Sequence, residues 1–89
     1  MPSSLHLEVK RLILQAVNRP DLRPEEIGDR DPLFGEGSLG LDSLDALEIA
    51  VALHRRWGVR LDDKNLARKI LADVDTIVTW LRGQGIDAA

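Results

Sequence analysis

The sequence predicts an all-α fold, a small four-helix bundle with a short third helix and a long loop between helices one and two. Apolar residues recur at helical spacing in several segments. The chain has one Phe, two Trp and no Tyr, so Leu, Ile, Val and Ala must form its core, which suits helix-on-helix packing. Its 89 residues are enough for one domain over 1–89.

The first helix is expected over about residues 4–18. Ser3 or Ser4 can cap its start, and Pro20 should close it. The apolar positions with helical spacing, which we expect to face the core, are Leu5, Val9, Leu12, Ile13 and Ala16. The polar positions expected to turn away are Glu8, Lys10, Arg11 and Gln15.

A long segment from Asn18 to Asp42 separates the first helix from the second. It holds three of the four prolines and four of the seven glycines, which disfavour regular structure. A loop of this length suits a small domain when it packs its own side chains inward. We therefore expect an ordered loop with four inward apolar residues: Leu22, Ile27, Leu33 and Phe34.

The remaining helices are expected over about 43–57, 64–70 and 74–82. Gly58 should stop the second helix, Asp62 or Asp63 should cap the third, and Asp73 should cap the fourth. The expected core stripe of the second helix is Ala46, Ile49, Ala50, Leu53 and Trp57, and that of the fourth is Val74, Ile77, Val78 and Leu81. Residues 83–89 are expected to form a frayed tail.

Composition argues against several classes of function. The net charge is -3 and the basic residues are scattered, which disfavours nucleic-acid binding. No apolar stretch approaches the ~20 residues of a membrane span, and the start does not resemble a signal peptide, so a cytoplasmic location is expected. Without cysteine, any thiol chemistry needs a cofactor.

A monomer is the default expectation.

Other motifs lack the context that their chemistry requires. Residues 35–40 match G-x-G-x-x-G but follow no strand, and Asp29 with Asp31 lacks the later ligands of a calcium loop. His6 and His54 are expected to be exposed and to bind no metal. Ser43 and His54 would lie ~16 Å apart along one helix, too far for a nucleophile and its base. No catalytic residue is predicted.

Residues 39–49 read LGLDSLDALEI, and here the chain resembles the acyl carrier protein family over nearly its whole length. The resemblance implies that Ser43, next to the motif residue Asp42, receives 4′-phosphopantetheine from coenzyme A through a phosphopantetheinyl transferase. It also implies a non-enzymatic carrier that holds acyl groups as thioesters for transient partners, the acyl-loading and acyl-processing enzymes. The residues before the serine point to the fatty-acid or polyketide branch rather than to peptidyl carriers.

The position of Ser43 agrees with this implication. A serine at a helix start exposes its hydroxyl where unpaired backbone N–H groups and the helix dipole favour a phosphodiester. The simpler interpretation is that Ser43 or Asp42 only caps the helix, and the two interpretations are compatible.

The second helix also carries the residues expected to meet partner enzymes. Asp42, Asp45 and Glu48 gather at its start, where the dipole alone would favour them and where the resemblance implies contact with basic patches. The second apolar row is Leu44, Leu47 and Val51, and we expect part of it, above all Leu44, to be exposed for partners. For Leu47, partner contact and ordinary core packing are both open.

Arg55 is also expected to meet partner enzymes, and it differs in charge from the residues usual in general fatty-acid carriers. It lies between His54 and Arg56 in a stretch that is usually acidic in general fatty-acid carriers. The change predicts a carrier that serves one particular pathway. The alternative is a small helical protein-interaction module that is never modified.

Overall fold

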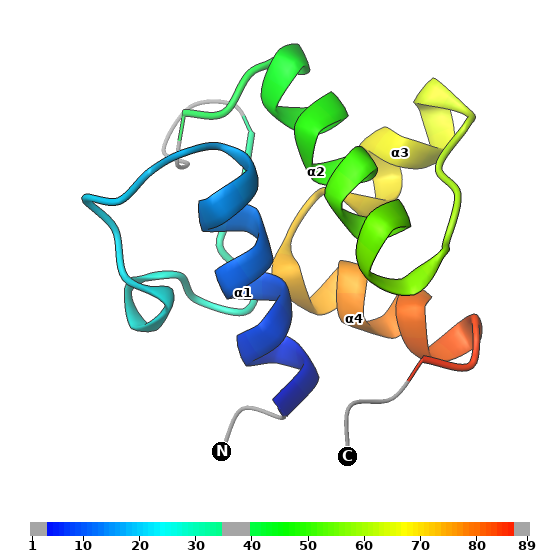
Figure 1. Ribbon diagram of the computed structural model, residues 1–89, viewed down its shortest axis with the longest axis horizontal. Helices are drawn as coiled ribbons and strands as arrows, with labels where there is room; N and C mark the ends of the chain where they lie inside the picture. Colours follow the sequence, from blue (N-terminus) through cyan, green and yellow to red (C-terminus); the bar gives the residue numbers. More distant parts are fainter. Residues whose placement is uncertain (1–3, 35–39, 87–89) are drawn as a thin grey trace.

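The structure is a computed structural model and describes residues 4–34 and 40–86. The described chain forms four α-helices and one short 3₁₀ helix, and no strand (Figure 1). In chain order these are α1 (Ser4–Ala16), η1 (Pro24–Glu26), α2 (Ser43–Trp57), α3 (Lys64–Ile70) and α4 (Val74–Gly83). The predicted all-α fold, with its short third helix, is confirmed.

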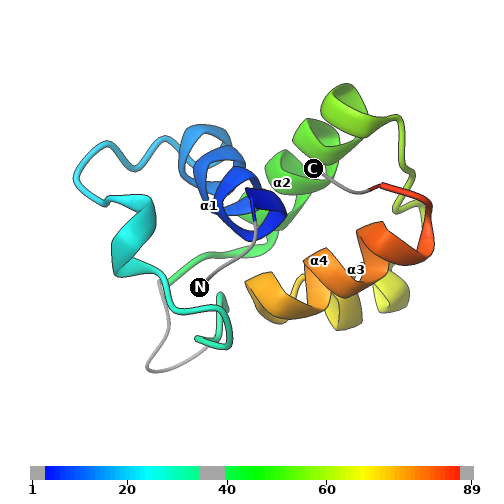
Figure 2. The ribbon, with the colours of Figure 1, turned by 90° about the horizontal axis from the view of Figure 1, so that it is seen from below.

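The helices form two layers. Figure 2 shows α1 and α2 on one side of the molecule and α3 and α4 on the other. Helix α1 packs against both α2 and α4, while α3 packs against α4. The first part of the connection between α1 and α2, residues 17–34, passes around the outside of α1 in Figure 1.

One core is shared by all four helices and by the long loop. Isolated helices of this length are marginal in water, so each needs the others to bury its apolar stripe. The core residues that are wholly buried in α1, α2 and α4 are Leu5, Val9, Ile13, Ile49, Leu53, Val74, Ile77, Val78 and Leu81.

The long loop packs its apolar side chains inward, as the sequence predicted. Ile27 and Leu33 are buried, and the backbone N–H of Leu33 donates to the carbonyl of Ala72 at 3.1 Å. The loop contains η1 and ends in an isolated parallel bridge between Phe34 and Leu41. The G-x-G-x-x-G residues 35–39 lie outside the described residues.

Most predicted helix boundaries have the expected capping residues. Gly58 ends α2 in the left-handed conformation at φ 73°, which glycine adopts without strain. The side chain of Asp63 accepts hydrogen bonds at the start of α3, and that of Asp73 does so at the start of α4. Of the two candidates for the α3 cap, the structure selects Asp63.

The predicted end of the first helix was wrong by two residues. Helix α1 ends at Ala16 because Asn18 takes the left-handed conformation at φ 53°. The N–H of Arg19 then donates to the carbonyl of Leu14 at 3.1 Å, which closes the helix before Pro20 is reached. Ser4 is the first helical residue, and the other cap candidate, Ser3, lies outside the described residues.

The frayed tail predicted from residue 83 was also wrong in part. Helix α4 includes Gly83, and Gly85 takes the left-handed conformation beyond it. The N–H of Ile86 donates to the carbonyl of Leu81 at 3.0 Å, and Ile86 packs against the core. This is a Schellman closure with its usual apolar contact. Residues 87–89 lie outside the described part.

Two side chains differ from their predicted environments. His6 and Lys10, which were expected to face solvent, are buried. Leu47, for which partner contact and core packing were both open, is 60% exposed, so it does not pack in the core. Helical spacing gives the direction of a buried stripe but not its width, which depends on the neighbouring elements.

Within residues 4–34 and 40–86, no helix is both long enough and apolar enough to cross a membrane.

The burial of α2 gives a direct stability test. Leu53→Ala should lower the free energy of unfolding by about 2–5 kcal/mol, because it removes a wholly buried side chain. Leu47→Ala should change it by about 0.5 kcal/mol or less, because Leu47 is exposed. Urea unfolding followed by tryptophan fluorescence measures both. Equal losses would show that α2 is rotated relative to the fold described.

Candidate functional site

Ser43 is the first residue of α2 and is exposed. The residue before it, Asp42, caps the helix by accepting the N–H of Asp45 at 3.0 Å. The side chain of Asp45 in return accepts the N–H of Asp42 at 3.0 Å, which completes a reciprocal capping box. Because Asp42 supplies the cap, the Ser43 hydroxyl is not needed for it.

The segment before Ser43 is anchored on both sides. Gly40 has φ 75°, a conformation that favours glycine, and redirects the chain into the helix. Leu41 is buried in the core and bridges to Phe34. The buried Leu41 and the capping box therefore fix the backbone that carries Ser43.

The start of α2 can accept a phosphodiester. The first N–H groups of a helix have no partner within it and, together with the helix dipole, they attract anions. Ser43 is exposed at this end, so the 4′-phosphopantetheine implied by the sequence fits without rearrangement of the core. The carboxylates of Asp42 and Asp45 already accept two backbone N–H groups at this end of the helix, in the capping box.

The exposed side of α2 is a ridge that begins beside Ser43. We call it the α2 ridge, and its residues are Leu44, Leu47, Glu48, Val51 and Arg55. Leu44 is 64% exposed and Val51 41% exposed, so three large apolar residues, with Leu47, lie on one face. The expectation that Leu44 is exposed is confirmed, and Leu47 joins it. Clustered exposed apolar residues are typical of protein contact sites.

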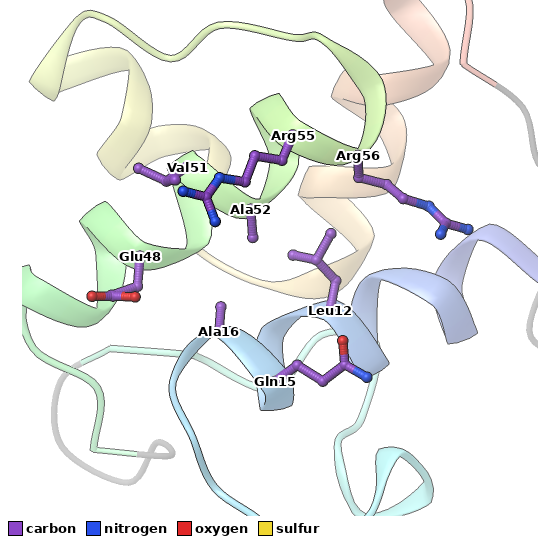
Figure 3. A pocket seen from close by; sticks show the side chains of 8 residues that line it. All are labelled: Leu12, Gln15, Ala16, Glu48, Val51, Ala52, Arg55 and Arg56. Carbon is purple, nitrogen blue, oxygen red and sulfur yellow. The ribbon is translucent and has the colours of Figure 1, made fainter.

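A shallow groove of about 320 Å³ lies between the α2 ridge and α1 (Figure 3). Its α1 side is formed by Leu12, Gln15 and Ala16. Its α2 side is formed by Glu48, Val51, Ala52, Arg55 and Arg56. The sequence did not predict a role for the α1 residues, because Leu12 and Ala16 fit the core stripe and only their half-burial separates them from it.

The three basic residues at the end of α2 have different surroundings. His54 Nδ1 lies 3.2 Å from the carbonyl of Val59, within the turn that follows the helix. Arg56 forms an ion pair with Glu8 of α1 and lies over the Trp57 ring at 5.6 Å. Arg55 is exposed on the α2 ridge and extends over the groove in Figure 3. Within the described residues it forms no ion pair.

The family model for the phosphopantetheine attachment site matches residues 8–81. This range covers most of the chain and includes the α2 start described above. The chain belongs to the phosphopantetheine attachment-site family. A search of curated proteins finds no match.

Membership establishes the cofactor of this carrier protein, which is covalently attached 4′-phosphopantetheine. The group supplies a thiol on a long flexible arm, which this chain cannot supply because it has no cysteine. Domains of this family are generally carriers rather than catalysts. The resemblance seen in residues 39–49 is confirmed at the level of the family, and the match favours a carrier over an unmodified interaction module.

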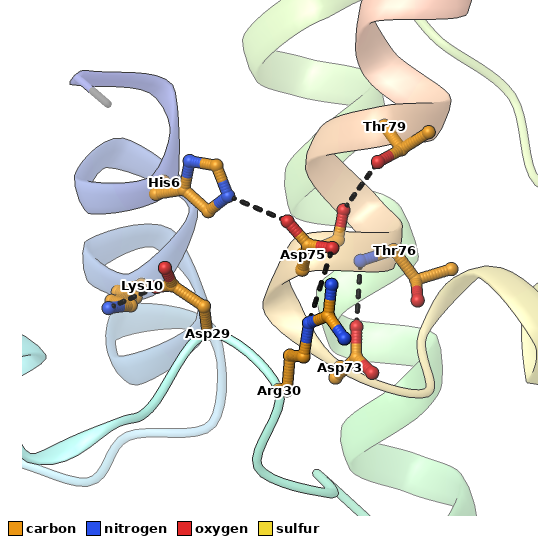
Figure 4. Close-up of polar contacts among 8 residues, drawn as sticks. All are labelled: His6, Lys10, Asp29, Arg30, Asp73, Asp75, Thr76 and Thr79. Carbon is orange, nitrogen blue, oxygen red and sulfur yellow. Dashed lines mark hydrogen bonds and ion pairs between the residues drawn. The ribbon is translucent and has the colours of Figure 1, made fainter. Parts of the chain in front are cut away.

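The carrier's long loop is held by an ion pair away from Ser43 (Figure 4). The ammonium group of Lys10, on α1, lies 2.7 Å from Oδ1 of Asp29 in the loop. Hydrogen bonding to Lys10 lowers the pKa of the Asp29 carboxyl below its ordinary value. The loop that leads to Ser43 is therefore fastened to α1.

A second polar contact joins the loop and α1 to α4. His6 Nε2 lies 3.1 Å from Oδ1 of Asp75, and Arg30 Nε lies 4.0 Å from the other oxygen of the same carboxylate. The N–H of Asp75 donates to the carbonyl of Asp29 at 2.8 Å. These contacts explain the burial of His6, which the sequence could not predict because its partner is 69 residues away.

Neither histidine belongs to a metal site in the described part of the chain, where no group of three or more His, Cys, Asp or Glu side chains could hold an ion. Asp29, which resembled the start of a calcium loop, is instead paired with Lys10.

The capping box predicts a contrast at the α2 start. Asp42→Ala should lower the free energy of unfolding by about 1 kcal/mol, since it removes the helix cap. Asp42→Asn should cost much less, because Asn also caps well, and Ser43→Ala should preserve the fold. Urea unfolding curves of the three variants check this. A larger loss for Ser43→Ala than for Asp42→Ala would contradict the assigned cap.

The pairing of Asp29 predicts an acid-dependent loss of stability. Because the pKa of Asp29 is lowered in the folded state, its contribution is present above about pH 4 and is lost as the pH falls through the folded pKa. Asp29→Asn should reduce the stability difference between near-neutral pH and about pH 3, as measured by urea midpoints. Asp62→Asn, at an exposed connector position, is the matched control. Identical pH profiles for the two variants would contradict the assigned role.

Proposed function

We propose that Ser43 is the attachment residue, and that the protein holds acyl groups as thioesters on the 4′-phosphopantetheine arm. The observation that supports this most directly is the position of Ser43, exposed at the first turn of α2, beside an aspartate that takes over the capping. The family match includes this position.

The attachment reaction is the transfer of a phosphopantetheinyl group from coenzyme A. Ser43 Oγ forms a bond to the phosphorus that carries pantetheine, and the bond from that phosphorus to the bridging diphosphate oxygen breaks. The 3′,5′-bisphosphorylated adenosine departs, and the hydroxyl proton passes to a base of the transferase. The chain itself contributes an unhindered hydroxyl and a helix end that tolerates the new negative charge.

The fold contributes a fixed origin for the arm. Leu41 is buried and Asp42 is hydrogen-bonded to Asp45, so the backbone at Ser43 is held while the arm moves. Tethering raises the effective concentration of a bound acyl group at an enzyme that has docked on the carrier, to the millimolar range for short flexible links. We assign the α2 ridge to this docking.

The charges on α2 support a proposal about the kind of pathway that the carrier serves. The start of α2 carries Asp42, Asp45 and Glu48, which suit a basic patch on a transferase or another partner. Further along the helix, the positive charge of Arg55 would repel such a patch. We propose that the carrier serves one particular fatty-acid, polyketide or related pathway rather than general fatty-acid synthesis.

The attachment site is tested by intact mass after incubation with coenzyme A, magnesium and a broad-specificity phosphopantetheinyl transferase. The wild-type chain should gain one phosphopantetheine unit, and Ser43→Ala should gain none while keeping its helical circular dichroism. The same gain in the Ser43→Ala variant would refute Ser43 as the site. No gain by the wild-type chain with several transferases would favour the unmodified interaction module.

Pathway specificity is tested with the loaded carrier. The malonyl transferase and ketosynthase of general fatty-acid synthesis should show a kcat/KM several-fold lower than with a carrier that is acidic along the whole of α2, because Arg55 meets their basic patch. Steady-state assays with both carriers measure this. Equal efficiency would sink the proposed restriction to one pathway.

A further inference from the structure

The charge of the α2 ridge changes from negative to positive along the helix. Glu48 lies in its second turn, with Asp45 of the first turn beside the ridge, and Arg55 lies in its last turn. Glu48 and Arg55 are seven residues apart, which places them on one face about 10 Å apart along the axis. A partner that covers the whole ridge must therefore meet two opposite charges.

Arg55 is the basic residue at this end that is available to a partner. Arg56 already pairs with Glu8 and covers Trp57, and His54 faces the turn carbonyl of Val59. Both residues stabilise the end of α2 and its contact with α1. Arg55 is exposed and has no ion pair within the described residues.

The groove beside Arg55 adds an apolar contact to this charge. Val51 and Ala52 line it from α2, and Leu12 and Ala16 line it from α1 (Figure 3). Its open, shallow form suits an aliphatic side chain brought in by another surface. An apolar centre with a polar, solvent-accessible rim is the usual composition of a protein–protein interface.

We propose that an acyl-processing enzyme docks across both the α2 ridge and the α1–α2 groove. Its surface presents a basic group to Asp45 and Glu48. About 10 Å farther along, it presents a carboxylate to Arg55, next to an aliphatic side chain that enters the groove. The inference rests on the proposed function and adds α1 to the docking surface. Arg55 is the residue that excludes enzymes whose patch is basic throughout.

The first experiment measures how Arg55 excludes the wrong partner. The wild-type chain and the Arg55→Gln and Arg55→Glu variants are loaded fully with phosphopantetheine and offered to the general malonyl transferase. The kcat/KM should rise in the order Arg, Gln, Glu, by about two- to fivefold overall, the range for one exposed ion pair. The matched control is Arg60→Glu, the same charge change in the exposed connector after α2, which should change kcat/KM by less.

The second experiment tests whether a carboxylate placed opposite Arg55 allows the excluded enzyme to dock. Each Lys and Arg on the carrier-docking face of the same transferase is replaced singly by Glu. At least one replacement should raise kcat/KM with the wild-type chain and lower it with Arg55→Glu, because the charge pair has been exchanged. The difference between the two carriers should become smaller when Ala52→Leu fills the groove, because the partner's aliphatic side chain can then no longer enter it.

The outcomes separate this inference from the proposed function. If mass measurement shows full loading at Ser43 but Arg55→Glu and Arg60→Glu behave alike, or if no transferase variant inverts, the docking inference is overturned and the carrier assignment stands. Failure to load Ser43 would instead overturn the proposed function. A dimer of the wild-type chain that Arg55→Glu dissolves, seen by sedimentation, would assign the ridge to a second copy and overturn the inference.

Discussion

Four short helices bury their apolar stripes in one shared core, and this packing determines which surfaces of the protein remain exposed. Ile49 and Leu53 turn one face of α2 inward, and this fixes which face is left for other molecules. Leu44, Leu47 and Val51 are exposed as a direct result. The same burial holds Leu41, and so the backbone at Ser43, against the body of the domain. The shared core therefore determines both the exposed face of α2 and the position of the backbone at Ser43.

Local signals predicted much of this fold. The stripes of α2 and α4 and the caps at Gly58, Asp63 and Asp73 depend on residues within one or two turns of each other, so the sequence contains them directly. The α2 start was predicted for the same reason, since Asp42 and Asp45 form their capping box across three residues.

The sequence could not predict features that depend on distant partners. Lys10 is buried because Asp29 reaches it from the loop, and His6 because Asp75 reaches it from α4. The exposure of Leu47 depends on how far neighbouring helices extend over α2, and the groove is lined jointly by α1 and α2, which are far apart in the sequence. In the proposed docking surface, the residues of α2 were named from the sequence, whereas those of α1 were assigned to the core.

The proposed function needs a fixed origin for the arm and a surface that distinguishes partner enzymes. As the proposed attachment residue, Ser43 needs an open hydroxyl and a fixed backbone, which the cap and the core provide. For partner selection we propose a charge that is not already paired within the fold: Arg56 is paired with Glu8, whereas Arg55 is exposed. In this proposal, attachment and recognition lie on one helix but depend on different residues.

We propose above all that the protein carries an acyl group as a thioester on an arm at Ser43. The most direct measurement transfers acyl-phosphopantetheine from an acyl-coenzyme A with a phosphopantetheinyl transferase and then fragments the tryptic peptide that spans residues 31–55 by mass spectrometry. We expect the whole modification on Ser43 and release of the acyl group by neutral hydroxylamine, which cleaves thioesters. Modification of Ser38, the other serine of that peptide, or an acyl group that resists hydroxylamine would contradict it.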